Sequence, residues 1–247
     1  MIGADAAWTT PGQLWSALGN EEIAFSIRLS LFTCTIAALL SLVVAVPAGY
    51  LLSRGDFPGR ALVDVIVDIP IVLPPLVIGL SLLILFRLPL PWTGDPPVRL
   101  NDVLPLTYTV GGVILAQFTV GAAFAVRTMR ATFDHLPRRP EDVARVLGCS
   151  RAGAVWRVTL PAARRGMVTA FTLAWARSLG EFGPILVFAG ATRMRTEVMP
   201  TTVFLELSVG NLEPAIAVSL LMVLLSIAVM LVLRWAGDQG GASHDRL

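Results

Sequence analysis

Two pairs of ionisable side chains, each spaced four residues apart, are the first candidates for chemistry in this sequence. Asp64 and Asp68 could act as a general acid and base, because a helix would place both on one face. No serine nucleophile or metal-binding cluster accompanies them, and His135 and His244 lie elsewhere in the chain. We therefore expect the two acids to be solvated or to pair with arginines, and we predict no catalytic residue, no metal site and no cofactor.

The second pair, Arg177 and Glu181, interrupts the apolar run 167–190. The spacing predicts that the two side chains pair on one helical face. Such a pair could fix the orientation of its helix, or it could line a translocation path near a gate, where Gly180 and Gly183 would allow a second subunit to approach. An arginine suits a dianion, but the adjacent carboxylate opposes it. Arg177 is therefore not assigned as a substrate ligand.

Composition identifies the kind of element that carries these residues. Of 247 residues, 55% are hydrophobic and only 15% are charged, and the mean hydropathy is +0.74. Globular proteins average about 25% charged residues. Disorder and a disulfide-rich secreted fold are excluded, since apolar residues dominate and only two cysteines are present. Lipid is the expected solvent.

Apolar runs predict a polytopic, all-α membrane bundle of five transmembrane helices, because about 20 apolar residues cross a bilayer. The runs are 29–52, 69–86, 104–126, 167–190 and 214–233. The second run contains Pro70, Pro74 and Pro75, so a kinked span is expected there. No repeat or soluble domain is visible in the sequence.

The arginines predict the orientation of the bundle. All nineteen basic residues are arginine, and nine of them lie within 127–166. Basic residues are retained in cytoplasmic loops. The third loop, 127–166, and the first loop, between the runs 29–52 and 69–86, are therefore expected inside. The prediction is a multi-pass plasma (inner) membrane protein with an extracytoplasmic segment 1–24, a transmembrane domain 25–235 and a cytoplasmic tail 236–247. No cleaved leader is expected.

The long third loop is expected to contain two short helices. Pro140 suits the first position of a helix, with acidic residues in its first turn. Gly148 is a natural stop, Ser150 can cap a second helix, and Pro161 is expected to end it. The apolar residues of the two helices are Val143, Ala144, Val146 and Leu147, followed by Val155, Trp156 and Val158.

Three roles compete for this loop. Its arginines could hold an amphipathic element on anionic lipid. A nucleic-acid patch is disfavoured, because no stacking platform accompanies the basic residues. The third role is the docking of a cytoplasmic protein, and the residue spacing favours that role.

The spacing within the loop resembles the EAA loop of importer-type ABC permeases, in which E-A-A is followed by three residues, glycine, nine residues and I-x-L-P. Here D-V-A is followed by three residues, glycine, nine residues and V-T-L-P. Asp142 stands where the family has glutamate, and Val143 where it has alanine. The resemblance implies an ATPase-coupling role for Asp142, Ala144, Gly148, Val158, Leu160 and Pro161.

Two further segments, 57–75 and 176–183, are similar to molybdate permeases of the molybdate/tungstate/sulfate group, and the resemblance covers about 25–235. It implies the type I ABC importer fold and a homodimer bound to two cytoplasmic ABC ATPase subunits. An extracytoplasmic oxyanion-binding protein would deliver the cargo. The chain has no G-x-x-x-x-G-K-[ST] loop and no lysine, so ATP hydrolysis is expected from the partner.

The resemblance leaves sulfate or tungstate as alternative cargo within the same group. Two other classes of membrane protein fit the sequence less well than a permease does. A membrane-embedded enzyme is disfavoured because the pair Arg177 and Glu181 offers too few convergent groups. A passive channel would not need a docking loop.

Overall fold

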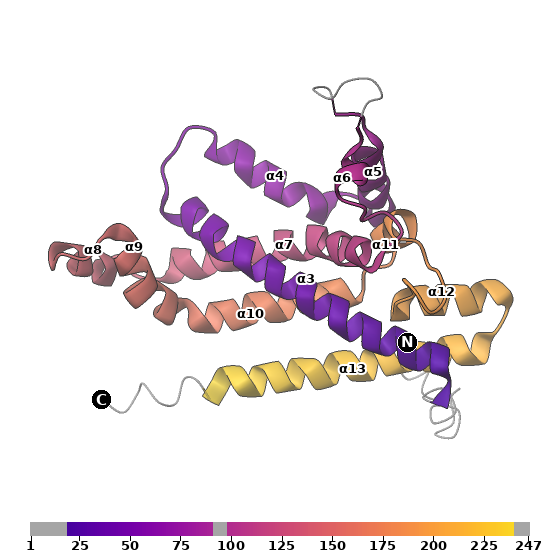
Figure 1. Cartoon of the computed structure of the whole chain (residues 1–247). Helices are drawn as coiled ribbons and strands as arrows, with labels where there is room; N and C mark the ends of the chain where they lie inside the picture. Colours follow the sequence, from indigo (N-terminus) through magenta and orange to yellow (C-terminus); the bar gives the residue numbers. More distant parts are fainter. Residues whose placement is uncertain (1–18, 91–97, 240–247) are drawn as a thin grey trace.

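The computed structural model describes residues 19–90 and 98–239, which fold into helices joined by short connections (Figure 1). The only extended pairing in these residues is an isolated antiparallel bridge between Pro89 and Arg99. The helices are α3 (Glu21–Arg54), α4 (Arg60–Val72), α5 (Pro75–Arg87), α6 (Leu100–Val103), α7 (Val110–His135), α8 (Arg139–Val146), α9 (Arg151–Ala154), α10 (Leu160–Leu179), α11 (Gly183–Phe188), α12 (Met199–Val209) and α13 (Leu212–Gln239). A π-helical turn, η1 (Val155–Thr159), joins α9 to α10. The predicted all-α class is confirmed.

Helices α3, α7 and α10 pack together at the centre of the molecule. Their contacts are lined by small residues, including Cys34, Ala38, Ala45, Ala125, Ala170 and Ala174. Gly49 shows how close α3 and α7 come, because a Cβ added there would lie 2.8 Å from the Met129 Cβ. Small residues allow the close contacts that hold helices together in lipid.

The second predicted span is broken rather than kinked. In place of one helix over 69–86, α4 and α5 meet at an angle of 114°. Leu73 is extended, with ψ of 141°, and Pro74 and Pro75 follow it. The residue before a proline avoids the helical region, and Pro75 suits the first turn of α5. The helix therefore ends before Pro74 and restarts in a new direction.

The predicted span 167–190 is also divided. Helix α10 ends at Leu179, with Gly180 as its C-cap, and α11 begins at Gly183. Helix α11 packs against α5. A Cβ added to Gly183 would lie 2.9 Å from the Pro75 Cβ, so the close approach expected at Gly183 is made within this chain.

By length and composition, three helices in the described part of the chain can cross a membrane, namely α3, α7 and the part Leu212–Leu233 of α13. The bent pair α4 and α5 adds a fourth if it is one span. Helix α10 does not qualify, since it contains Arg164, Arg165 and Arg177. The count of five spans stays a prediction.

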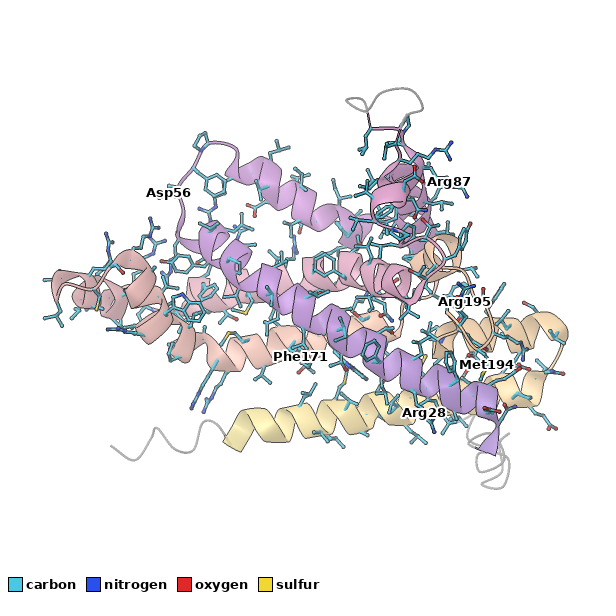
Figure 2. All side chains as sticks on the ribbon, viewed as in Figure 1. Arg28, Asp56, Arg87, Phe171, Met194 and Arg195 are labelled. Carbon is cyan, nitrogen blue, oxygen red and sulfur yellow. The ribbon has the colours of Figure 1, made fainter. Side chains whose placement is uncertain are left out.

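The connections gather at two ends of the bundle. Figure 1 shows α8, α9 and the α3–α4 connection at one end, with α6, α11 and α12 toward the other. Figure 2 labels Asp56 at the first end and Met194 and Arg195 at the second. The first and third loops therefore share one end, as the arginine distribution predicts. That this end faces the cytoplasm stays a prediction.

Several predicted boundaries differ from the structure because the helices continue beyond their apolar runs. Helix α3 begins at Glu21, where the Asn20 side chain accepts a hydrogen bond of 2.9 Å from the Glu22 N–H. Helix α13 continues to Gln239, past the predicted domain end at 235. Helices α7 and α10 shorten the predicted loop 127–166 to 136–159. Arginine is a good helix former. Residues 1–18 and 240–247 of the predicted terminal segments lie outside the described residues.

Candidate functional site

The α8–α9 segment is built by local sequence signals. Pro140 lies in the first turn of α8, together with Glu141 and Asp142. Gly148 has φ of +95°, a conformation that glycine adopts without strain. The Ser150 side chain then accepts a hydrogen bond of 3.1 Å from the Gly153 N–H and caps α9. The expected stop at Gly148 and cap at Ser150 are confirmed.

The expected helix end at Pro161 is wrong. Helix α9 continues through η1 into α10, and Pro161 lies in the first turn of α10. In η1, the Leu160 N–H bonds to the Val155 carbonyl, five residues back. The π-helical turn ends two residues before Pro161, which has no N–H to donate, and the fixed φ of proline suits the first turn of α10. As a result, α9 is joined to α10 without a break.

Four large apolar side chains stand exposed on this segment, and we refer to them as the α8–α9 patch. They are Val143, Val146, Leu147 and Trp156, with exposed fractions of 57%, 87%, 80% and 72%. Asp142 beside them is also exposed, whereas Ala144, Val158 and Leu160 are half-buried. The sequence predicted packing contacts for Trp156, but most of its side chain is exposed. An exposed apolar patch next to polar residues is typical of a protein-binding surface.

Glu141 holds the segment in place. Its Oε1 accepts a hydrogen bond of 2.5 Å from the Tyr50 hydroxyl of α3, and its Oε2 accepts one of 3.0 Å from the Thr159 hydroxyl of η1. The motif indicates a role for Asp142, one residue later, and the role of Glu141 is one that sequence reasoning missed. The spacing of the motif contains no signal for it, because Tyr50 lies 91 positions away.

The end of α3 also secures the connection between α7 and α8. The Ser53 hydroxyl donates a hydrogen bond of 2.6 Å to Asp134 Oδ1. Arg54 Nη2 donates to the Leu136 carbonyl at 2.7 Å, and Arg138 Nη2 donates to the Ser53 carbonyl at 3.3 Å. These bonds tie the base of α8 to the centre of the bundle.

The predicted pair of Arg177 and Glu181 is present, with Arg177 Nη2 lying 2.8 Å from Glu181 Oε1. The two residues do not share a helical face, because α10 ends before Glu181. The Glu181 side chain is 1% exposed and that of Arg177 is 35% exposed. The contact is an ion pair without a hydrogen bond, because no N–H of Arg177 meets hydrogen-bond geometry at Glu181 Oε1. The Arg177 guanidinium also lies 5.7 Å from the centre of the Phe124 ring, within range of a cation–π contact.

Asp64 and Asp68 pair with arginines of α7, which is one of the two roles expected for them. Arg127 donates to both oxygens of Asp68, from Nε at 2.6 Å and from Nη2 at 2.5 Å, and Arg130 pairs with Asp64. The two acids therefore fasten α4 to α7. Among the side chains that the structure describes, in residues 19–90 and 98–233, no three of His, Cys, Asp or Glu lie close enough to hold a metal ion.

A second buried carboxylate, which sequence reasoning also missed, lies in the connection between α11 and α12. Glu197 is 0% exposed, and neither of its carboxylate oxygens has a hydrogen bond of acceptable geometry in the described structure. Beside it, Arg193 pairs with Glu22 of α3 and, at 2.8 Å, with Glu206 of α12. Arg193 thus links the start of α3 to α12 at the end of the bundle opposite α8.

Comparison with known proteins identifies the family. The family described as "Binding-protein-dependent transport system inner membrane component" matches residues 41–238. The chain belongs to this family. A probable molybdenum ABC transporter permease protein of Haloferax volcanii is 34% identical over 236 residues, which are 96% of this chain and 84% of the relative. A molybdate/tungstate transport system permease protein of Thermococcus kodakarensis is 33% identical, over 90% of this chain and 82% of the relative.

Sulfate permeases belong to the same set of relatives. The sulfate transport system permease protein CysT of Escherichia coli is 29% identical over 87% of this chain and 76% of the relative. Among solved structures, a bacterial ABC transporter that imports alginate superposes with a TM-score of 0.72 at 17% identity, covering 97% of this chain and 88% of that chain. A methionine ABC transporter in an inward-facing conformation gives 0.67 at 20% identity, covering 94% and 97%.

The family match and the relatives together establish what kind of protein this is. It is a multi-pass membrane protein and an ABC importer permease of the molybdate/tungstate/sulfate group. The ABC importer permease fold that the resemblance to molybdate permeases implied is confirmed by the two superpositions.

Proposed function

We propose that this permease forms the translocation path of an ATP-driven importer for molybdate, working as a homodimer with two cytoplasmic ATPase subunits. An extracytoplasmic oxyanion-binding protein would deliver the cargo. The relatives named for molybdenum, molybdate and tungstate support the choice of anion. Sulfate is the alternative, supported by the relative named for sulfate transport.

The α8–α9 patch is the observation that carries the coupling proposal. Four apolar side chains, from Val143 to Trp156, are exposed next to Asp142, which gives an ATPase cleft an apolar surface with a charged rim. Closure of two ATPase subunits around nucleotide would draw the two copies of this patch together. The motion is a rigid-body transition between two states, biased by a ligand that binds another subunit.

The connections of α8 and α9 supply the path from the patch to the bundle. Because α9 continues through η1 into α10, displacement of α9 moves α10 with it. Glu141 passes the same displacement to α3 through Tyr50. The proposed path or gate residues, Arg177, Gly180, Glu181 and Gly183, lie at the far end of α10 and the start of α11. Movement of α10 would therefore reach the gate directly.

Gly148→Trp tests the coupling proposal, and Gly210→Trp is its matched control. Both glycines have positive φ, +95° and +87°, and an added Cβ at either would meet no atom within 4 Å. Backbone strain is therefore similar in the two variants, but Gly210 lies between α12 and α13, away from the patch. Gly148→Trp should lose co-purification with the ATPase or transport-stimulated ATP hydrolysis, whereas Gly210→Trp should keep both. Intact stimulation in Gly148→Trp would refute the docking assignment.

The anion is tested separately, with the extracytoplasmic binding protein that stimulates this permease, once it is identified. Calorimetry should show tight binding of molybdate and weaker binding of sulfate. Sulfate as the tighter ligand would move the assignment to the alternative. Tight binding of an organic solute would refute oxyanion transport without affecting the permease class.

A further inference from the structure

Helix α7 carries a buried amide in its largely apolar middle. The Gln117 side chain is 1% exposed. Its Nε2 donates a hydrogen bond of 3.3 Å to the Ser178 carbonyl of α10 and one of 3.4 Å to the Cys34 sulfur of α3. Polar side chains within membrane-spanning helices are costly and usually have a functional role. Gln117 therefore lies where the three central helices meet, in a position that calls for a function.

The Ser178 carbonyl, which Gln117 contacts, is the point at which α10 ends. The helix stops at Leu179, and the N–H groups of Gly180 and Glu181 both turn back to this oxygen, at 3.2 Å for Glu181. Carbonyl groups at a helix end have no partner within the helix, and in lipid each of them needs a donor. Gln117 thus supplies, from another helix, a donor for the carbonyl around which the chain leaves α10.

The close approach of α7 and α10 lets Gln117 reach this carbonyl. One turn further along α7, a Cβ added to Gly121 would lie 3.1 Å from Ser178 Oγ and 3.4 Å from the Ala174 carbonyl oxygen. The polar contact is incomplete, because neither Gln117 Oε1 nor Ser178 Oγ has a hydrogen-bond partner among the described residues. Leaving a buried polar atom unpaired costs stability. An apolar side chain would avoid that cost, so stability alone does not account for Gln117.

We propose that Gln117 is a positioning residue for transport, which fixes where α10 ends and thereby places Glu181 beside Arg177. Glu181 follows the Ser178 carbonyl by three residues, and its own N–H bonds to that carbonyl. Movement of α10 that starts at α8 and α9 must carry or break the Gln117 contact before it reaches this pair. The inference rests on the proposed function, in which Arg177 and Glu181 lie at the path or gate.

Gln117→Leu in the full-length chain tests the inference, with Thr119→Val as the matched control. Thr119 is half-buried on the same helix, and its hydroxyl donates to the Leu115 carbonyl of that helix at 2.9 Å. Hydrogen exchange of the permease alone, in detergent, should be about twofold to tenfold faster at the backbone amides 180–183 in Gln117→Leu and unchanged in Thr119→Val. The unfolding temperature of Gln117→Leu should not fall, because the substitution also removes an unpaired oxygen.

Uptake then shows whether the position of this helix end matters for transport. In proteoliposomes with the ATPase and binding protein, Gln117→Leu should move about twofold to tenfold less substrate per ATP hydrolysed, with association of the ATPase unaltered. Three results would overturn the inference: unchanged exchange at 180–183, unchanged uptake per ATP, or a lower unfolding temperature, which would make Gln117 a stabilising contact only. The exchange measurement needs neither the ATPase nor the cargo, so the inference can fail while the proposed function holds, and the reverse.

Discussion

Tyr50 near the end of α3 donates a hydrogen bond of 2.5 Å to Glu141 in the first turn of α8. The same carboxylate accepts a hydrogen bond of 3.0 Å from Thr159 in η1. One side chain thereby joins α3, α8 and the turn that leads into α10. Displacement of α8 by a bound ATPase cannot leave α3 and α10 behind unless these bonds break.

Tyr50→Phe should weaken coupling. A hydrogen bond to a charged group contributes about 1.5 to 3 kcal/mol, so losing this one should loosen α8 from α3. In proteoliposomes with the ATPase and binding protein, we expect less substrate transported per ATP hydrolysed. Tyr108→Phe is the control, because Tyr108 is half-exposed and lies between α6 and α7. An unchanged ratio in Tyr50→Phe would show that the bond plays no part in coupling.

Arg177→Ala and Glu181→Ala should have unequal effects on stability. Removing Arg177 leaves a carboxylate that is 1% exposed without its cation, whereas removing Glu181 leaves an arginine that is 35% exposed. Breaking a fully buried pair from one side costs about 3 to 5 kcal/mol, and the exposure of Arg177 makes the cost smaller here. We expect Arg177→Ala to lower the unfolding temperature most, and the double variant to recover most of the loss.

Transport by the double variant decides between the two roles of this pair. Recovery of both stability and uptake would indicate that the pair only orients its segment. Recovered stability with lost uptake would place the pair on the translocation path. Arg177→Ala as stable as the unsubstituted protein would contradict the structural role.

Arg193→Ala should loosen the end opposite α8, because Arg193 joins Glu22 of α3 to Glu206 of α12. Leaving the largely buried Glu206 with fewer partners costs about 1 to 3 kcal/mol. Differential scanning fluorimetry in detergent should show a lower unfolding temperature. Arg195→Ala, from the same connection, should not lower it. Equal unfolding temperatures for the two variants would show that the ion pairs of Arg193 add no stability.

Glu197 should make stability depend on pH. Burial raises the pKa of Glu197, and the nearby Thr202 and Arg193 offset the rise only in part. The folded state then holds its proton more tightly than the unfolded chain, whose glutamate pKa is about 4.3. The contribution of Glu197 is fully present below that value and is lost as the pH rises through the folded pKa.

Glu197→Gln should remove this pH dependence and raise the unfolding temperature at neutral pH. Thermal unfolding of the two proteins between about pH 4 and pH 8 measures the effect. Glu213→Gln, at an exposed position, is the control. Parallel pH profiles for the unsubstituted protein and Glu197→Gln would show that Glu197 does not titrate in this range.

Local signals in the sequence predicted much of the proposed coupling segment. The stop at Gly148 and the cap at Ser150 depend on backbone conformation and on hydrogen bonds within three residues, so both can be inferred from the chain alone. The predicted helix end at Pro161 is wrong because proline occurs both just after a helix and in the first turn of one. The structure around Pro161 depends on η1, the π-helical turn just before α10 that joins α9 to it. No simple composition rule predicts a π-helical turn.

The sequence by itself determined the apolar composition, the long apolar helices α3, α7 and α13, and the residue spacing that indicates an importer permease. These features follow from hydropathy, capping and residue order, which act over one helix or less. Only the tertiary structure decided the 114° bend between α4 and α5, the attachment of α4 to α7 and the partners of Glu141 and Arg193. Each of these depends on the packing of helices that are distant along the chain, and small residues such as Gly49 set how closely those helices approach.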